Sequence, residues 1–105
     1  MLTFEDFQKI ELKVGKVLAA ERVEGSTKLL KLQIDLGEPR QILAGLGKVY
    51  TPEDLIGKEV VVVANLEVRT IMGLESQGMV LAASSEVGPI VLMPEKEVTV
   101  GSKIS

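Results

Sequence analysis

Residues 10–23 alternate between apolar and polar side chains, and the alternation changes phase near the middle of the segment. Leu12 and Val14 would share one face of a strand, but continuing that phase would bury Lys16. Gly15 stands at the change, and a glycine inside a strand often marks a bulge or a sharp bend. A long first strand bent by a glycine suits a small closed barrel, because such a strand has to serve two sheets.

Further short strands are predicted along the rest of the chain. The clearest covers residues 28–36, where leucine or isoleucine at every second position faces one way and Lys31 and Gln33 face the other. A Gly37-Glu38-Pro39 turn then closes a hairpin onto the next strand. Further strands are predicted at residues 40–44, 58–66, 78–84 and 89–93, followed by short segments at 98–100 and 103–105.

Two short helices complete the pattern. Thr3, with Asp6 three residues later, resembles a capping box and predicts a helix over residues 3–9. The run Thr51-Pro52-Glu53-Asp54 is typical of a helix start, so a second short helix falls between the third and fourth strands. This order of elements predicts an all-β fold, a five-stranded oligonucleotide/oligosaccharide-binding (OB) barrel that occupies residues 1–105 as one domain.

The core of such a barrel would have to be aliphatic. Hydrophobic residues make up 46% of the 105 residues, but aromatic residues only 3%, namely Phe4, Phe7 and Tyr50. Phe4, Phe7 and Ile10 recur every three residues, so we expect the first helix to pack this stripe on the core or on a partner.

Several classes of chemistry are excluded by missing residues. The chain has no Cys and no His, so it has no thiolate nucleophile, no catalytic Ser–His or Cys–His pair and no ordinary transition-metal site. The run Gly45-Leu46-Gly47-Lys48 is not a Walker A loop, because Val49 stands where Ser or Thr is needed. The longest apolar run, residues 60–64, is too short to span a membrane, and no signal peptide is present, so we expect a cytoplasmic protein.

The most unusual stretch is residues 64–79, which connects two apolar strands. It carries Asn65, Arg69, Ser76 and Gln77, whose side chains can contact phosphate groups or base edges. An ordinary polar loop would have a similar composition, so this stretch alone leaves both interpretations open.

Several segments of the chain, taken in order, resemble a known family. They are Phe7-Gln8-Lys9-Ile10-Glu11-Leu12-Lys13-Val14-Gly15-Lys16-Val17, Thr27-Lys28-Leu29-Leu30-Lys31-Leu32, Arg40-Gln41-Ile42-Leu43-Ala44-Gly45, Val61-Val62-Val63-Ala64-Asn65-Leu66, Gly73-Leu74-Glu75-Ser76-Gln77-Gly78-Met79 and Met93-Pro94-Glu95-Lys96-Glu97-Val98. Together they look like the tRNA-binding domain at the C-terminus of methionyl-tRNA synthetase. The same module resembles free-standing tRNA-binding proteins and the endothelial monocyte-activating polypeptide domain.

The resemblance implies a non-catalytic module of protein biosynthesis that binds tRNA by its shape and backbone. It implies a homodimer built from the terminal segments, no cofactor, and a methionyl-tRNA synthetase catalytic subunit or domain as a possible partner. The family's RNA-binding positions carry over to Lys28, Asn65, Arg69, Ser76, Gln77 and Met79. We add Lys31, because strand alternation places it on the outer face of the barrel.

The net charge of the chain disfavours nucleic-acid binding, so only a local cluster of basic residues can favour such binding. Twelve basic and fifteen acidic residues give a net charge of −3. A local patch of Lys28, Lys31 and Arg69 could still attract phosphate, with weak and salt-sensitive binding as the expected result. The scarcity of aromatic side chains disfavours stacking of single-stranded bases and favours recognition of backbone and shape.

Two other functions compete with tRNA binding. A dimeric protein-binding export chaperone of the same fold is one, although such chaperones lack a stretch like Glu75-Ser76-Gln77-Gly78-Met79. An enzyme that uses a pair of carboxylates is the other, and no two acids stand in a distinctive apolar context. At single positions the plainer alternatives are a solvated charge for each lysine and a core-filling role for Met79.

Overall fold

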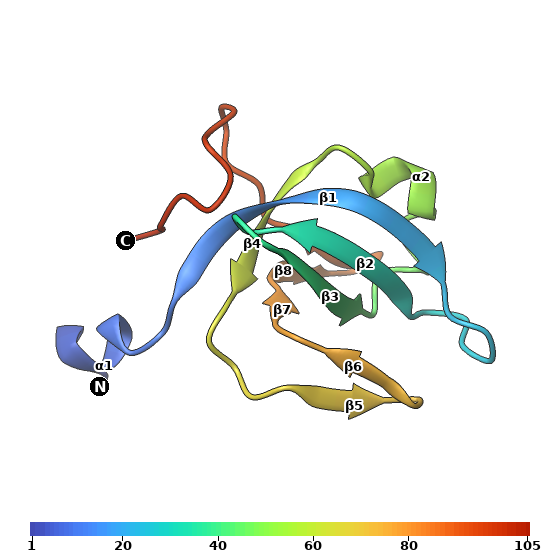
Figure 1. The fold of residues 1–105 in the computed structure, drawn as a ribbon, viewed down its shortest axis with the longest axis horizontal. Helices are drawn as coiled ribbons and strands as arrows, with labels where there is room; N and C mark the ends of the chain where they lie inside the picture. Colours follow the sequence, from blue (N-terminus) through green and yellow to red (C-terminus); the bar gives the residue numbers. More distant parts are fainter.

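The computed structural model describes residues 1–105 and contains two short helices and nine strands (Figure 1). In chain order they are α1 (Phe4–Gln8), β1 (Leu12–Arg22), β2 (Leu30–Asp35), β3 (Pro39–Ala44), α2 (Pro52–Leu55), β4 (Glu59–Val63), β5 (Arg69–Ile71), β6 (Leu74–Ser76), β7 (Met79–Val80), β8 (Ala82–Ser85) and β9 (Gly88–Val91). The predicted order, with a helix at the start and another between the third and fourth strands, is confirmed.

The first strand belongs to two antiparallel pairs, as its length predicted. Its first half, Leu12 to Lys16, pairs with β4, and its second half, Lys16 to Arg22, pairs with β2. The five-stranded sheet therefore runs in the order β3-β2-β1-β4-β7. Because β7 also lies against β3, the sheet is nearly closed, which confirms the OB-like barrel.

The predicted bulge at Gly15 is wrong. The register of β1 against β2 shifts between Val17 and Ala19, so the irregularity falls at Leu18. Glycine is required at position 15 for a different reason, because a Cβ atom there would lie 2.5 Å from Cγ2 of Ile34. The glycine lets the two strands approach closely where β1 passes from one partner to the other.

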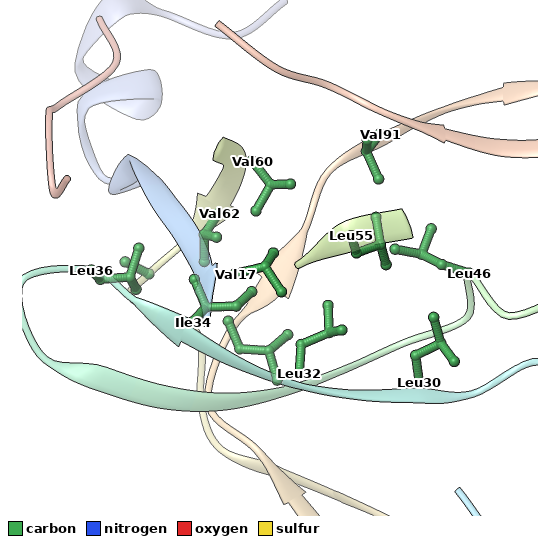
Figure 2. Close-up of a cluster of buried hydrophobic side chains, with 12 residues drawn as sticks. Val17, Leu30, Leu32, Ile34, Leu36, Leu46, Leu55, Val60, Val62 and Val91 are labelled. Carbon is green, nitrogen blue, oxygen red and sulfur yellow. The ribbon is translucent and has the colours of Figure 1, made fainter. Parts of the chain in front are cut away.

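An aliphatic core fills the barrel (Figure 2). Leu30, Leu32 and Ile34 of β2 are fully buried, as their alternation predicted. Helix α2 contributes Leu55, which is also fully buried and covers one end of the core. The remaining members come from the other strands and connecting loops, and include Val17, Leu36, Ile42, Leu46, Val60, Val62, Ala64 and Val91.

Residues 64–79 are more ordered than a polar loop. They contain a separate hairpin, β5–β6, whose tip is Met72 and Gly73, both with positive φ (51° and 80°). The strand expected at residues 78–84 is divided into β7 and β8, which belong to different sheets. Neither segment expected after residue 97 forms a strand, and only an isolated bridge between Lys13 and Lys103 remains there.

The N-terminal helix projects from the barrel on the side where the C-terminal tail also ends (Figure 1). Its capping box is present: the Thr3 hydroxyl accepts from the Asp6 N–H at 3.1 Å, and the Asp6 carboxylate accepts from the Thr3 N–H at 3.2 Å. No residue of α1 is buried, so the stripe of Phe4, Phe7 and Ile10 does not pack on the core. Neither helix has the length or the apolar run that crossing a membrane requires.

Candidate functional site

A groove of about 420 Å³ lies between the barrel and the β5–β6 hairpin. We call it the cationic groove, and its lining includes Lys28, Ala44, Gly45, Leu46, Arg69 and Met79. Lys28 precedes β2, Arg69 begins β5 and Met79 begins β7, so residues far apart in the sequence meet here. Most of the lining is apolar and none of it is acidic.

The two cations of this groove are free to bind an anion. Lys28 and Arg69 are both exposed, and neither forms an ion pair within the protein. The structure thus brings together two of the three residues of the predicted basic patch. Two unpaired cations beside an apolar floor form a surface that attracts phosphate in a chain of net negative charge.

The backbone of Lys28 is held in place from the loop that follows β3. The Gly47 N–H donates to the Lys28 carbonyl oxygen at 2.7 Å, and Nη1 of Arg22 donates to the Gly47 carbonyl oxygen at 3.0 Å. Arg22 therefore lies close to the backbone of Lys28, and the exposed Lys48 directly follows Gly47 in the chain. Our sequence interpretation missed both residues, although the run that ends in Lys48 had been considered and set aside as a phosphate loop.

The hairpin tip approaches the β1–β2 loop near the cationic groove. A side chain placed at Gly25 would have its Cβ 3.3 Å from the terminal methyl carbon of Met72, so the two residues are in close contact. Gly25 belongs to the β1–β2 loop, which also carries Lys28, whereas Met72 follows the groove residue Ile71. The two loops therefore approach each other beside residues that line the groove.

Lys31 does not join the other two cations. It lies on the outer side of β2, as alternation predicted, but its Nζ is 2.5 Å from Oε1 of Glu21 on the neighbouring strand. It does not line the cationic groove. Its charge is therefore partly compensated within the protein.

Ser76 and Gln77 attach the hairpin to the barrel. The Ser76 hydroxyl, 4% exposed, accepts from the Leu43 N–H at 3.0 Å and donates to the Gly78 carbonyl oxygen at 3.1 Å. Gln77 pairs with Gln41 twice: its Oε1 accepts from the Gln41 N–H at 3.1 Å and its N–H donates to the Gln41 carbonyl oxygen at 2.8 Å. Ser76 and Gln77 thus hold the hairpin against the barrel, and in this way they position Arg69 at its start and Met79 just after it.

Asn65 holds the segment between α1 and β1. Its Oδ1 accepts from the Glu11 N–H at 2.8 Å, and its Nδ2 donates to the Lys9 carbonyl oxygen at 2.7 Å. In the same segment, a hydrogen bond from Lys13 and the charge of that lysine lower the pKa of the exposed Glu11 carboxyl. Asn65 therefore fixes the base of the projecting N-terminal helix.

Met79 is 42% exposed, so the core-filling alternative is wrong. It separates the cationic groove from a second groove of about 470 Å³, which we call the terminal groove. The terminal groove is lined largely by apolar side chains, namely Ile10, Leu12, Val63, Leu66, Met79 and Leu81. It lies beside the base of α1.

The structure gives little support for a metal site or for a catalytic pair of carboxylates. No group of three or more acidic residues is arranged to hold a metal ion. The Asp54 carboxyl at the start of α2 has a pKa lowered by the hydrogen bond that it accepts from the Thr51 backbone N–H. Asp54 is exposed and Glu11 partly exposed, and both serve local structure, so they do not form a pair of the kind a carboxylate enzyme uses.

Comparison with known proteins gives one consistent result. Residues 12–103 match the model of the family described as "Putative tRNA binding domain". The chain is 51% identical to part of the methionine–tRNA ligase of Caldanaerobacter subterraneus subsp. tengcongensis, and 52% identical to part of that of Thermotoga maritima. Each match covers 99% of this chain but only 16% or 17% of the ligase, so the chain spans about a sixth of the length of these relatives.

Solved structures of similar fold cover the whole chain. A structure of a methionyl-tRNA synthetase-related protein from Pyrococcus horikoshii matches with a TM-score of 0.93 and 36% identity, over 100% of this chain and 98% of that one. The chaperone CsaA of Bacillus anthracis matches with a TM-score of 0.90 and 35% identity, over 100% of this chain and 99% of that one. The C-terminal domain of Plasmodium vivax p43 matches at 0.89 and 34%, over 97% of this chain and 63% of that one.

Proposed function

Because this chain belongs to the tRNA-binding domain family, we propose that it binds tRNA and that the cationic groove is the centre of its RNA-binding surface. The observation that carries this placement is the pair of unpaired cations, Lys28 and Arg69, on a groove without acidic residues. Phosphate contacts of this kind dominate the affinity of proteins for nucleic acids.

We propose recognition of backbone and shape rather than base sequence. Lys28 and Arg69 contact phosphates, and Arg22 and Lys48 extend the basic surface along the neighbouring loop. Ser76 and Gln77 support this surface through the hydrogen bonds described above, whereas Asn65 holds the segment beside the terminal groove. With a net charge of −3, the expected binding is weak and falls steeply with added salt.

We further propose that the domain serves methionyl-tRNA synthetase without being an enzyme itself. The support is the identity of 51–52% with a segment of methionine–tRNA ligases that spans about a sixth of their length. A tRNA-binding module linked or docked to a catalytic unit raises the local concentration of tRNA there. This role places the chain in the cytoplasm, and it requires no cofactor.

The test is an electrophoretic shift assay with bulk tRNA, an anticodon hairpin and single-stranded RNA. We expect the wild type to prefer intact tRNA, and the double variant Lys28→Ala/Arg69→Ala to lose most of its affinity. The control, Lys16→Ala/Lys96→Ala, removes the same charge from exposed residues outside the cationic groove. Equal affinity in the two double variants, with folding unchanged, would remove this groove from the RNA-binding surface.

We propose that two copies of the chain associate through their terminal segments. Phe4 and Phe7 are 72% and 37% exposed, and the largely apolar terminal groove opens at the base of the same helix. Exposed apolar surface of this kind usually marks an interface, and two-fold dimers are the commonest assembly. Sedimentation equilibrium should give twice the chain mass, and Phe4→Ser/Phe7→Ser should shift it toward the monomer. A monomer mass for the wild type at micromolar concentration contradicts this proposal.

The alternative function is binding of unfolded polypeptide. The similarity to CsaA chaperones, including 35% identity with the Bacillus anthracis protein, is the observation that favours it. The apolar terminal groove would be the site, provided that a second copy does not cover it. Suppression of aggregation of a denatured protein, together with absence of any tRNA shift, would favour this function over tRNA binding.

A further inference from the structure

We propose that the cationic groove receives one unpaired nucleotide of the bound RNA, with its base against the apolar floor and its phosphates at Lys28 and Arg69. This inference rests on the proposed function, and it names the feature of the RNA that the groove recognises. Besides the recognition of backbone and shape, it predicts one point at which a base of the RNA inserts into the protein surface.

The size and lining of the groove suit a nucleotide. Its volume of about 420 Å³ falls within the range of roughly 300–1,000 Å³ that is typical of sites for small ligands. Two cations at an otherwise apolar groove complement a ligand that joins an anionic group to a flat, weakly polar one. Aliphatic side chains such as Leu46 and Val80 provide contact area for a base in place of an aromatic stacking partner.

Gly45 is a groove residue whose lack of a side chain the fold itself does not explain. Every other glycine of the chain either has a positive φ or is so crowded that a Cβ would meet its neighbours. Gly45 has neither property, and a Cβ there would find no atom within 4 Å. Nothing within the chain therefore requires glycine at a position that lines the cationic groove. A ligand seated in the groove would account for it, since a large side chain at this position would compete with the ligand for room.

The contact between Met72 and Gly25 limits what can enter. It brings the hairpin tip close to the β1–β2 loop, next to the groove residues Ile71 and Lys28. We infer that this approach leaves less room there for a continuous single strand than for one nucleotide. A single nucleotide turned out of a helix or loop can enter from the open side, so we commit to one nucleotide rather than a strand.

The groove offers no basis for choosing among the bases. Apart from Lys28 and Arg69, no lining side chain carries a hydrogen-bonding group. Discrimination between bases normally needs donors and acceptors placed against the base edges. We therefore expect purines and pyrimidines to bind alike, and the loss of the base to matter more than its identity.

The experiment compares three short RNA hairpins of equal charge with intact tRNA. One hairpin is fully paired, one carries a single bulged uridine and one carries an abasic residue at the bulge. We expect the bulged uridine to bind several-fold more tightly than the other two, because burial of the base removes apolar surface from water. A bulged adenosine should bind as the uridine does.

Two variants at one position then test the groove itself. Gly45→Leu fills the groove from an exposed position without a clash, whereas the matched control Gly45→Ala leaves most of the space free. Gly45→Leu should abolish the preference for the bulged hairpin and leave the salt dependence of binding unchanged, because no cation is removed. Gly45→Ala should keep both.

The outcomes separate this inference from the function on which it rests. If tRNA binds but the three hairpins bind equally, the nucleotide site is disproved and tRNA binding stands. If Gly45→Leu binds the bulged hairpin as well as the wild type does, the site is not in this groove and the inference fails. If neither tRNA nor any hairpin binds, the proposed function fails and the nucleotide site fails with it.

Discussion

The Gly47 N–H donates a 2.7 Å hydrogen bond to the carbonyl oxygen of Lys28, and a Cβ at position 47 would lie 2.8 Å from that oxygen. The loop after β3 therefore sets where the backbone of Lys28 lies. Since Lys28 is one of two cations on the cationic groove, a residue that cannot itself bind phosphate governs the geometry of the basic surface.

The substitution Gly47→Ala should destabilise the protein and weaken tRNA binding together. The added methyl group meets backbone atoms that cannot rotate away, and overpacking of this kind typically costs about 1–3 kcal/mol. Thermal unfolding measures the stability and a shift assay measures the affinity. Gly45→Ala, two residues earlier in open space, is the control and should unfold at nearly the wild-type temperature.

Ser76→Ala should act on the hairpin rather than on the RNA directly. It leaves the buried Leu43 N–H without a partner, at a cost of about 1–3 kcal/mol. We expect lower stability in urea and weaker tRNA binding with an unchanged salt slope, because no charge is removed. Ser84→Ala, on an exposed face of β8, is the matched control. A loss of affinity without any loss of stability would point to direct contact between Ser76 and RNA instead.

The three predicted basic residues should differ in their salt dependence. Lys28→Ala and Arg69→Ala should each lower the slope of log affinity against log salt concentration by roughly one unit. Lys31→Ala should lower it by less, since Lys31 is already paired with Glu21 and lies outside the cationic groove. Titrations at several salt concentrations measure the slopes, and an equal effect at all three positions would contradict the distinction.

Asn65→Ala should loosen the N-terminal helix. The side chain bonds both the Glu11 N–H and the Lys9 carbonyl oxygen, and it adds to the backbone hydrogen bond from the Ala64 N–H to the Glu11 carbonyl oxygen that ties this segment to the end of β4. Hydrogen exchange of the amides around residue 11 should become faster, while exchange in β2 stays as slow as in the wild type. If the terminal segments build the dimer, the same variant should also dissociate at higher protein concentration than the wild type.

Asp54→Asn should reduce stability at neutral pH, and the difference should vanish in acid. The Asp54 carboxyl has a pKa below its usual value of 3.8 because it accepts hydrogen bonds from Thr51. A carboxyl whose pKa is lowered by folding contributes stability above its unfolded pKa and loses it as the pH falls through the folded value. The melting temperatures of the two proteins should therefore begin to approach each other as the pH falls below about 3.8, and should become equal only in stronger acid. A constant difference down to strong acid would show that charge at this helix start is unimportant.

The parts of the fold that could be predicted from sequence are those set by local pattern. The alternation in β2 fixed which side chains are buried, and Thr3 with Asp6 correctly placed the start of α1. The bulge was misplaced because Gly15 serves contact with Ile34 in another strand, and no local pattern distinguishes that need from a bulge. Whether glycine is needed at such a position depends on contacts between segments that are distant in the sequence.

The hairpin at residues 69–76 escaped prediction because its turn lacks the usual residues. Met72 takes a positive φ where Asn or Asp is ordinarily found, so Met72-Gly73 carried no hairpin signal. Ser76, Gln77 and Asn65 were chosen as candidate RNA contacts, and in the structure their side chains bond to backbone groups. Residue type alone does not distinguish a side chain that contacts RNA from one that bonds to the protein backbone. Lys28 and Arg69 are exposed and form no ion pair within the protein, and their contact with RNA stays a prediction.

The divided pairing of β1 has a consequence for the order of folding. Its second half pairs with β2, its neighbour along the chain, so the β1–β2–β3 meander can form early from local contacts. Its first half pairs with β4, which follows β2, β3 and α2 in the chain. The pair can therefore form only when the long loop between β1 and β4 closes, and closing so long a loop is slow. During that wait, the valine run of β4 is an unpaired apolar strand, the kind of segment that joins to other copies as an aggregate. We therefore expect substitutions in Leu12 to Lys16 to lower the yield of refolding at high protein concentration more than those in the second half of the strand.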